Sequence, residues 1–336
     1  MHCPVGAIVF SNPIEKVFDK IAEKNITTIA SIALSVRVAS AEEFGFPPRT
    51  IATGKVYAAL RALGFDYVLD TNFGADLTIA EEANEFVKRF TSEKNKLPMF
   101  TSCCPGWVDY AEKRYHNLLP HLSTTKSPQQ IQGVMTKTYF AKKIGVDKKK
   151  LFNVLIMPCT TKLFESERDK NMSASGVKDY DMVITKRELA HLLREAGIDF
   201  AHLKDADADK FMSSYSGAGT IFGATGGVME VALRTAYCTL TKKELGPIAY
   251  KDVRSLEGVK TSEIKINKTT KVRIAVVHQL GNVDAVVQAL REDIKAKRES
   301  VFHFVEVMAC RGGCVAGGGS RTGQLMMCAK NVSFRI

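Results

Sequence analysis

The stretch LFNVLIMPC, residues Leu151 to Cys159, decides the expected fold. It is an almost unbroken apolar run that ends at Pro158, directly before a cysteine. A short apolar run of this kind predicts a β-strand of a parallel sheet, whose two faces are covered by helices. Similar short runs recur along the chain and alternate with patterns of helical period.

The alternation of predicted strands and helices favours an α/β fold with parallel sheets flanked by helices. Predicted strands are Thr27–Ala33, Tyr67–Asp70, Leu97–Phe100, Leu151–Met157, Met182–Thr185, Val272–Val277 and Phe304–Met308. Predicted helices are Pro13–Glu23, Lys55–Leu63, Ile79–Phe90, Gly106–Arg114, Ile131–Lys143, Lys186–Ala196, Gly226–Tyr237 and Val283–Ala296. The segments Leu203–Ser214 and Lys251–Thr270 are predicted linkers.

Composition narrows the function classes. The 336 residues carry a net charge of +11 and eight cysteines, with no apolar run long enough to span a membrane and no signal peptide. A reducing, cytoplasmic location is therefore expected, with the thiols kept for metal or redox chemistry; an organelle is the alternative if a transit peptide precedes this sequence. The charge favours an acidic partner, and no nucleic-acid-binding motif accompanies it.

Five cysteines follow three of the predicted strands. Cys103 and Cys104 follow LPMF, Cys159 follows LFNVLIMP, and Cys310 and Cys314 follow FVEVMA. Ligands of open α/β sheets gather outside the carboxyl ends of the strands, so these thiols are expected to meet.

One cysteine from each of two loops and a Cys-x3-Cys from the third supply four thiolates, which suits an iron–sulfur cubane better than structural zinc. Glycines around Cys310 and Cys314 allow a close approach to an inorganic centre. Cys103 and Cys104 point to opposite sides of an extended chain, so one is expected to be a ligand and its neighbour to do something else, with a vicinal disulfide as an uncommon alternative. Cys238 and Cys328 are expected to be packed thiols.

Three motifs then carry a resemblance. The segments TSCCPGW (Thr101–Trp107), MPCTTKLFE (Met157–Glu165) and EVMACRGGCVAGGG (Glu306–Gly319) resemble, in this order, the signatures of the [FeFe]-hydrogenase catalytic domain. The resemblance extends from about Thr27 to Gly319. It implies two lobes, approximately 13–150 and 151–320 and partly intertwined, with the active site in the cleft between them.

The resemblance implies a six-iron H-cluster. Cys104, Cys159, Cys310 and Cys314 would hold a [4Fe–4S] cubane, and Cys314 would bridge to a two-iron unit with carbonyl, cyanide and azadithiolate ligands. Cys103 would be the neighbouring acid and base, with its thiol pKa tuned toward neutrality.

By the same resemblance, protons would reach the surface through Glu82, Ser123, Glu85 and Arg89. Glu82 and Glu85 are spaced to share a helix face, and Arg89 is expected to pair with Glu85 near the solvent end.

Further residues would surround the two-iron unit. Lys162 and Ser35 would donate to the cyanides, and Glu165 would orient Lys162. Gln129, Met157, Met308 and Gly223 would line the pocket.

The sequence departs from the family pattern in places. Leu34 and Arg311 replace usual prolines, and Thr161 replaces a usual alanine. Arg311 is expected to raise the cluster potential, contact ligand sulfur or loosen the ligand loop. Residues 1–12, with Cys3, resemble the end of a ferredoxin-type module, and 320–336 form a short tail. The chain therefore resembles minimal forms without accessory iron–sulfur clusters.

The expected activity is the reversible reduction of protons to H₂ with electrons from an acidic ferredoxin, after loading by hydrogenase maturation proteins. A hydrogen-sensing relative, a non-catalytic iron–sulfur assembly relative and an inactive degenerate product are the alternatives. The presence of Cys103 argues against the sensor, since such relatives often lose this thiol. The presence of both Cys103 and Lys162 argues against the assembly relative, which loses both.

Overall fold

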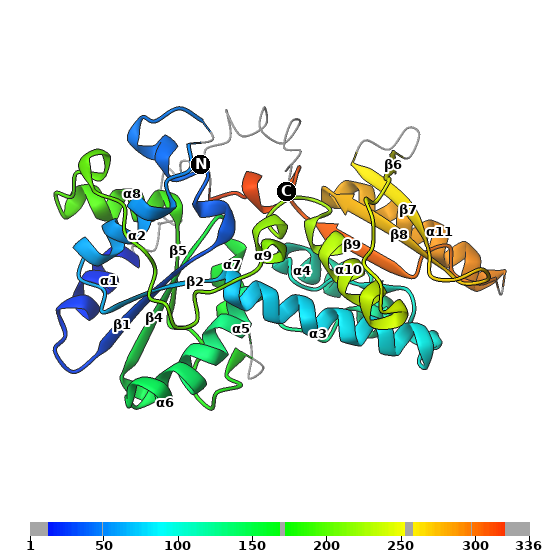
Figure 1. The fold of residues 1–336 in the computed structure, drawn as a ribbon, viewed down its shortest axis with the longest axis horizontal. Coiled ribbons are helices and arrows are strands. Elements are labelled where there is room, and N and C mark those ends of the chain that lie inside the picture. The colour runs from blue at the N-terminus through cyan, green and yellow to red at the C-terminus, as the bar shows by residue number, and fades with distance from the viewer. Residues whose placement is uncertain (1–12, 49, 169–171, 253–257, 297, 320–336) are drawn as a thin grey trace, which may run out of the picture.

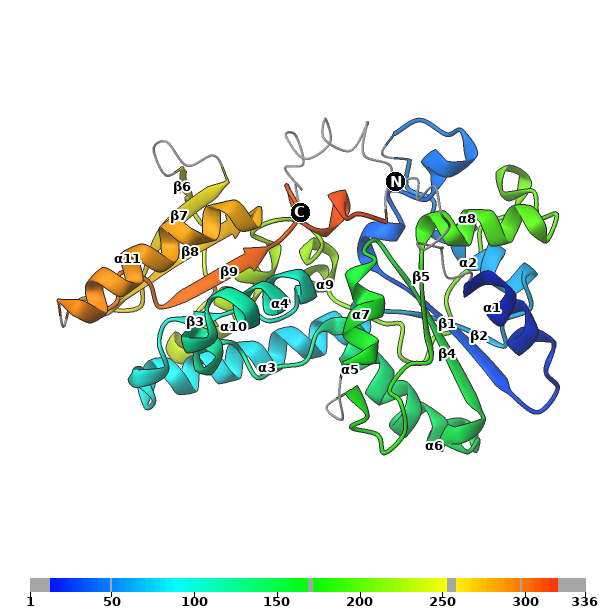
Figure 2. The same cartoon turned by 180° about the vertical axis from the view of Figure 1, so that it is seen from behind.

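The architecture consists of two β-sheets at opposite ends of the long axis, with helices between them. The computed structural model describes residues 13–48, 50–168, 172–252, 258–296 and 298–319. Helices α4 (Pro105–Arg114), α7 (Thr161–Glu167) and α9 (Gly217–Ile221) lie between the sheets in both views (Figures 1 and 2). The expected α/β fold with helix-flanked sheets is confirmed.

The first sheet is parallel throughout and has the strand order β2-β1-β4-β5. Its strands are β1 (Thr27–Ile32), β2 (Tyr67–Asp70), β4 (Leu151–Met157) and β5 (Met182–Thr185). Every residue of β4 is buried, as predicted from its apolar run. Helices α1 (Pro13–Ala22), α2 (Thr53–Ala62) and α8 (Lys186–Glu195) contribute to the core on one face. A π-helix, Thr136–Phe140, and α6 (Ala141–Ile144), which continue from α5 (Pro128–Met135), cover the other.

The second sheet is mixed, with the order β3-β9-β8-β7-β6. Its strands are β3 (Met99–Phe100), β6 (Lys251–Asp252), β7 (Val259–Lys265), β8 (Lys271–His278) and β9 (Phe304–Met308). The pairs β3–β9 and β9–β8 are parallel, whereas β8–β7 and β7–β6 are antiparallel. Alternate residues of β8 face opposite cores: Ala275 and Val277 pack with α4 and α11 (Val283–Lys295), and Ile274 and Val276 pack with α3 (Asn72–Thr91) and α10 (Gly227–Thr241).

Helix α3 links the two sheets. It starts directly after β2 of the first sheet and runs along the second sheet, where it packs on α10 (Figure 1). Near its start it packs against α5. One rigid element therefore fixes the distance between the two halves of the molecule.

The expected lobe boundary near residue 150 is wrong as a boundary between sheets. Strands β4 and β5 belong to the first sheet, whereas β3 belongs to the second. The chain crosses between the sheets more than once because β3 pairs with β9, about 200 residues later. The expected partial intertwining of the two lobes therefore also involves their strands.

One predicted linker is wrong, whereas the other is an irregular segment that nevertheless packs on the first core. Within Lys251–Thr270, strand β7 pairs along its whole length with β8. Within Leu203–Ser214, the side chains of Leu203, Ala206 and Ala208 pack on the first core, and the backbone N–H of Asp209 donates to the carbonyl of Val68 at 2.8 Å. Polar composition reflects exposure on one side of these segments, and tertiary pairing decides their structure.

Some expectations fall outside the described residues: the ferredoxin-like remnant 1–12 with Cys3, and the tail 320–336 with Cys328. Among the helices that the structure does describe, none combines the length and apolar character needed to cross a membrane.

The burial of β4 yields a stability prediction. The side chain of Ile156 is fully buried, so Ile156→Ala leaves a cavity and should cost about 2–5 kcal/mol of unfolding free energy, measured by denaturant titration. The control Ile51→Ala removes a side chain that is 74% exposed and should change stability by less than about 0.5 kcal/mol. Equal losses in the two variants would contradict the assignment of β4 to the core.

Candidate metal-cluster site

Four cysteines from three loops border one cavity of about 290 Å³. Cys104 lies between β3 and α4, Cys159 follows β4, and Cys310 and Cys314 follow β9. Their strands come from both sheets, so the cavity lies between the sheets, at the carboxyl ends of β4 and β9. The convergence expected from the strand ends is therefore present.

The loop after β9 needs glycine to take its path. Gly312 and Gly313 have φ values of 78° and 95°, which other residues rarely adopt. A Cβ on Gly313 would lie 2.6 Å from the backbone nitrogen of Thr225. The loop closes through a hydrogen bond from the N–H of Gly313 to the carbonyl of Cys310 at 3.2 Å. The tight turn brings Cys310 and Cys314 to the same cavity.

The cavity holds thiols that resist ionisation on their own. Burial, and then repulsion from neighbouring thiols, raises the pKa of Cys314 and raises that of Cys310 to about 11. Burial is also the main cause that raises the pKa of Cys104. Because metal ligation requires the thiolate, a cationic metal centre is the natural counter-charge for such a group of thiols.

The arrangement suits a cluster better than a single ion. Among the described residues, no three His, Cys, Asp or Glu side chains are grouped closely enough to share one metal ion. The four thiols nevertheless border the same cavity. Thiols spread around a cavity of this size fit an iron–sulfur cluster, whose iron atoms each take one thiolate.

Cys103 borders the same cavity as its neighbour Cys104 and is buried. Burial, and then the charge of Glu82, raises the pKa of the Cys103 thiol, while Lys162 opposes the increase. The expected shift toward neutrality depends on a metal centre beside the thiol and stays a prediction; the protein groups alone shift the pKa in the opposite direction. The desolvated thiol holds its proton at neutral pH.

Glu82 lies on α3 and is completely buried. Burial raises its pKa from 4.5 to about 8, and a hydrogen bond from Ser123 works in the opposite direction. One carboxyl oxygen of Glu82 has no partner among the described residues. At neutral pH this side chain is therefore a protonated carboxylic acid. It interacts electrostatically with the thiol of Cys103 and shares a hydrogen bond with Ser123.

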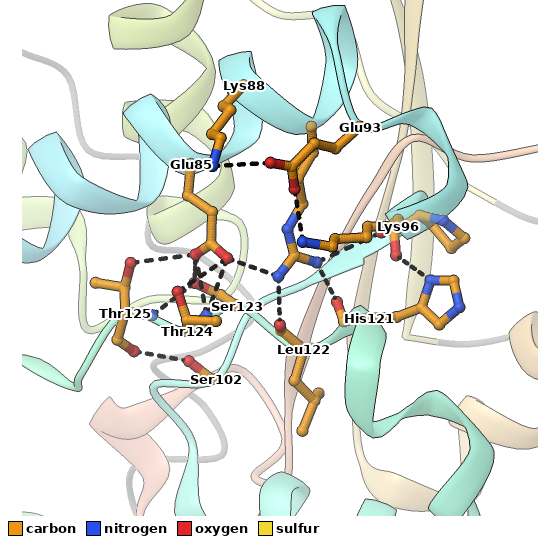
Figure 3. Close-up of polar contacts among 12 residues, drawn as sticks. Glu85, Lys88, Glu93, Lys96, Ser102, His121, Leu122, Ser123, Thr124 and Thr125 are labelled. Atoms are coloured by element: carbon orange, nitrogen blue, oxygen red, sulfur yellow. Dashed lines mark hydrogen bonds and ion pairs between the residues drawn. The ribbon is translucent and has the colours of Figure 1, made fainter.

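Glu85 lies one turn further along α3 and accepts hydrogen bonds from several donors (Figure 3). Ser123 donates through its hydroxyl at 2.8 Å, and Arg89 donates at 2.6 Å. The expected Glu85–Arg89 ion pair is present, with side-chain exposures of 15% and 3%. Arg89 is thus buried, contrary to the expectation that it marks the solvent end.

A second buried network centres on Lys162. Its ammonium donates to the carbonyl of Cys103 at 2.9 Å and to Glu165 at 3.1 Å. Burial lowers the pKa of Lys162, but Glu165 and the thiols of Cys103 and Cys314 outweigh it, so the pKa is raised and the cation persists. Lys162 borders the cavity, and Glu165 lies behind it.

Glu165 is itself held by further donors. Ser127 donates to it at 3.0 Å, and the amide of Gln129 donates to it and to the hydroxyl of Tyr180. The remaining cavity walls include the other expected side chains, which are Ser35, Gln129, Met157, Met308 and Gly223. Every expected pocket residue except Glu165 therefore borders the cavity.

Two of the sequence departures have local consequences. The hydroxyl of Thr161 lies 2.8 Å from the sulfur of Cys159. Leu34 lies against Gly223: a Cβ added to Gly223 would lie 2.9 Å from the side chain of Leu34. The third departure, Arg311, leaves the ligand loop closed, since Gly319 still donates to the carbonyl of Pro158 at 2.8 Å.

Sequence analysis missed Glu306. This residue of β9 is fully buried and accepts the backbone N–H groups of Gly226 and Met229 at 2.6 and 2.7 Å, which anchors the start of α10. Burial raises its pKa to about 7. The available signal was a carboxylate inside an apolar strand, since such residues are rarely buried without a role.

Cys238, expected to be a packed thiol, is exposed on α10. The buried residues of α10 lie between Gly227 and Ala236, so Cys238 falls beyond the buried part of the helix, near its C-terminal end.

The raised pKa of Glu82 predicts a pH dependence of stability. Between its unfolded pKa near 4.5 and its folded pKa near 8, the folded chain holds a proton that the unfolded chain releases. The stabilisation from this proton is complete below pH 4.5 and is lost as the pH rises through 8. We expect the unfolding free energy to fall less between about pH 5 and about pH 9 in Glu82→Gln than in the unchanged chain, measured by urea titration. Identical pH dependence in both chains would contradict a protonated Glu82.

Comparison with known proteins agrees with this geometry. The family model described as "Iron only hydrogenase large subunit, C-terminal domain" matches residues 26–318. Iron hydrogenase 1 of Clostridium pasteurianum is 47% identical over 316 residues, which cover 94% of this chain and 54% of that relative. The chain therefore spans about half the length of that relative.

Two further comparisons concern a solved structure and a more distant relative. A solved [FeFe]-hydrogenase, whose structure reveals stepwise H-cluster assembly, superposes with a TM-score of 0.82 at 36% identity and covers 95% of this chain and 88% of its own. A cytosolic Fe-S cluster assembly factor of Danio rerio is more distant, at 33% identity over 301 residues that cover 87% of this chain and 71% of that protein. The chain belongs to the family of iron-only hydrogenase large subunits, as a C-terminal domain of that family.

Proposed function

We propose that this chain is an [FeFe]-hydrogenase catalytic domain that reduces protons reversibly to H₂. The observation that carries the proposal is the single buried cavity bordered by Cys104, Cys159, Cys310 and Cys314 together with a fifth, protonated thiol, Cys103. Hydrogen chemistry needs an electron store and a proton donor in one place, and these groups are suited to provide both.

The cysteines would hold the H-cluster. Cys104, Cys159, Cys310 and Cys314 would bind a [4Fe–4S] cubane, and Cys314, whose environment is the most strongly thiol-rich, would also reach the two-iron subcluster with its carbonyl, cyanide and azadithiolate ligands. When bound, the cluster supplies the electrons and the open iron position at which H₂ forms. The cavity supports this proposal because its donors are thiols, the ligands that iron–sulfur clusters use.

Lys162 is suited to hold an anionic ligand of the two-iron subcluster. Its buried ammonium keeps its charge and is oriented by Glu165. Ser35 would be a second donor to the cyanides. Gln129, Met157, Met308 and Gly223 would line the two-iron pocket, where buried thioethers limit the access of water.

Proton transfer would begin at Cys103. The thiol holds its proton, Glu82 beside it is a neutral acid, and Ser123 connects Glu82 with the carboxylate of Glu85. Hydroxyl and carboxyl groups accept one proton while they release another, so the series can carry protons without a net change. Arg89 would hold Glu85 in place.

The proposed partners are inferred from the net charge of the chain and from the need to load the cluster into it. The net charge of +11 favours an acidic electron donor such as a ferredoxin, because opposite charges accelerate association. The assembly of the H-cluster in a solved relative supports a requirement for hydrogenase maturation proteins. A cytoplasmic location is proposed with these partners.

Two other functions use the same fold. A hydrogen sensor would need the cluster but little turnover, and an assembly factor would need the cubane alone. Both Cys103 and Lys162 border the cavity here, and neither would be needed as a ligand of the cubane. This favours the enzyme.

The proposal is tested by loading the chain. Co-expression with hydrogenase maturation proteins under anaerobic conditions should give carbonyl and cyanide stretching bands in the infrared spectrum and H₂ evolution with a chemically reduced donor. A cubane without these bands would support the assembly function instead. The bands without appreciable turnover would support the sensor.

The role of Cys103 has its own test. Cys103→Ala should retain the infrared bands of the cluster but lose about 100-fold or more in H₂ evolution, since the thiol that passes the proton is gone. Cys238→Ala, which removes an exposed thiol of α10, should match the unchanged chain. Undiminished turnover in Cys103→Ala would remove this residue from the proton route.

A further inference from the structure

The carboxylate of Glu85 is surrounded by two different kinds of neighbour (Figure 3). On one side lies the buried guanidinium of Arg89. On the other side lies the segment Ser123–Thr125, whose middle residue is exposed. We propose that the hydroxyl of Thr124 is the surface end of the proton route, and that Arg89 is a positioning residue that carries no proton. This inference rests on the proposed function.

The guanidinium of Arg89 is held by several hydrogen bonds and does not transfer protons. Besides Glu85, its guanidinium donates to the carbonyls of Leu122 at 2.8 Å, His121 at 3.1 Å and Lys96 at 3.4 Å (Figure 3). These bonds tie the end of α3 to two other segments. An arginine does not release its proton in proteins, so the side chain is a fixed cation that keeps Glu85 in one place.

The charged groups near Arg89 are engaged with one another. Glu93 lies between Lys88 and Lys96, at 2.8 and 2.7 Å, and these hydrogen bonds lower its pKa to about 2. The same contact raises the pKa of Lys88. His121 is directed to the carbonyl of Pro98 at 3.2 Å. The charges of Glu93, Lys88 and Lys96 are paired with one another. In the part of the chain that the structure describes, the side chains of Lys88, Glu93 and His121 make no hydrogen bond to Glu85.

Thr124, unlike the buried Arg89, contacts Glu85 and is also exposed to solvent. Its hydroxyl donates to Oε1 of Glu85 at 3.1 Å, and its backbone N–H donates to both carboxylate oxygens at 3.1 and 3.0 Å. The side chain is exposed, so its oxygen also meets water. The neighbouring hydroxyl of Thr125 is half-buried and more distant, at 3.4 Å.

The segment is held so that this contact persists. Ser102, next to Cys103, donates to the carbonyl of Thr125 at 2.9 Å, and the N–H of Thr125 donates to the hydroxyl of Ser123 at 3.2 Å (Figure 3). The loop that carries the catalytic thiol therefore also fixes the loop that carries the surface hydroxyl. Both ends of the proposed route are tied to one another.

The exchange step balances without any other reactant. For an inward proton, the Thr124 oxygen accepts a proton from a solvent hydronium ion, which becomes water, while its own hydroxyl proton passes to Oε1 of Glu85. One O–H bond of hydronium and the original O–H bond of Thr124 break, new O–H bonds form on Thr124 and on Glu85, and Glu85 becomes neutral. The outward direction is the reverse. No electron moves in this step.

The experiment compares Thr124→Val, Thr124→Ser and the control Thr91→Val. Thr124→Val keeps the backbone N–H and the shape but removes the hydroxyl, and Thr91 is an exposed threonine of α3 that bonds only to its own helix and to Ser92. We measure H₂ evolution by the loaded chain. We also follow by infrared spectroscopy the deuteration of the buried Glu82 carboxylic acid in the unloaded chain after transfer to D₂O, in a Cys103→Ala background that removes the thiol link to the cavity.

We expect Thr124→Val to slow both processes by at least about tenfold, Thr124→Ser to restore them, and Thr91→Val to change neither. Undiminished rates in Thr124→Val would overturn the proposal and indicate that water meets Glu85 directly; a loss in Thr125→Val alone would assign the role to that hydroxyl and overturn it as well. If the loaded chain produces no H₂ but Thr124→Val still slows the deuteration of Glu82, the proposed function fails and the surface end of the route stands.

Discussion

The carboxyl ends of strands from two separate sheets meet around one buried cavity, and the rest of the site depends on this meeting. β4 delivers Cys159 from the first sheet, while β3 and β9 deliver Cys104, Cys310 and Cys314 from the second. Parallel neighbours place their ends at the same edge, so β3 and β9 bring their loops together without a special turn. Helix α3, packed on elements of both halves, fixes how far apart these edges lie.

Burial is the second constraint, and it sets the chemistry of the groups around the cavity. The same desolvation that keeps the thiols of Cys103 and Cys314 protonated also makes Glu82 a neutral acid at pH 7. Lys162 stays charged in the same surroundings because Glu165, and after it Cys103 and Cys314, raise its pKa. Local partners therefore decide which buried groups of the site are neutral acids and which stay charged.

The sequence predicted the features that depend on local patterns. The buried run of β4, the helix that carries Glu82 and Glu85, and the cysteines at strand ends were all readable from apolar period and spacing. Strand β7 was not, because its polar residues face solvent and only its pairing with β8 makes it a strand. The lobe boundary failed for a related reason: β3 pairs with a strand far along the chain, and no local signal records that partner.

Within the site, the residue types were easier to predict than their surroundings. The pairing of Arg89 with Glu85 followed from helical spacing, but its burial under three backbone carbonyls depends on segments distant in sequence. Glu306 was missed because its role is to anchor a helix start that is formed 80 residues earlier in the chain. The sequence shows directly which side chains can act as ligands, whereas the electrostatic environment of those side chains depends on tertiary packing.

The convergence of four thiols on one cluster is tested most directly by anomalous X-ray scattering at the iron edge, in a crystal of the chain reconstituted with iron and sulfide. We predict one compact iron peak inside the cavity between β4 and β9, with bonds to the sulfur atoms of Cys104, Cys159, Cys310 and Cys314. Iron bound elsewhere, or bound by Cys103 in place of one of these four cysteines, would contradict the site described above.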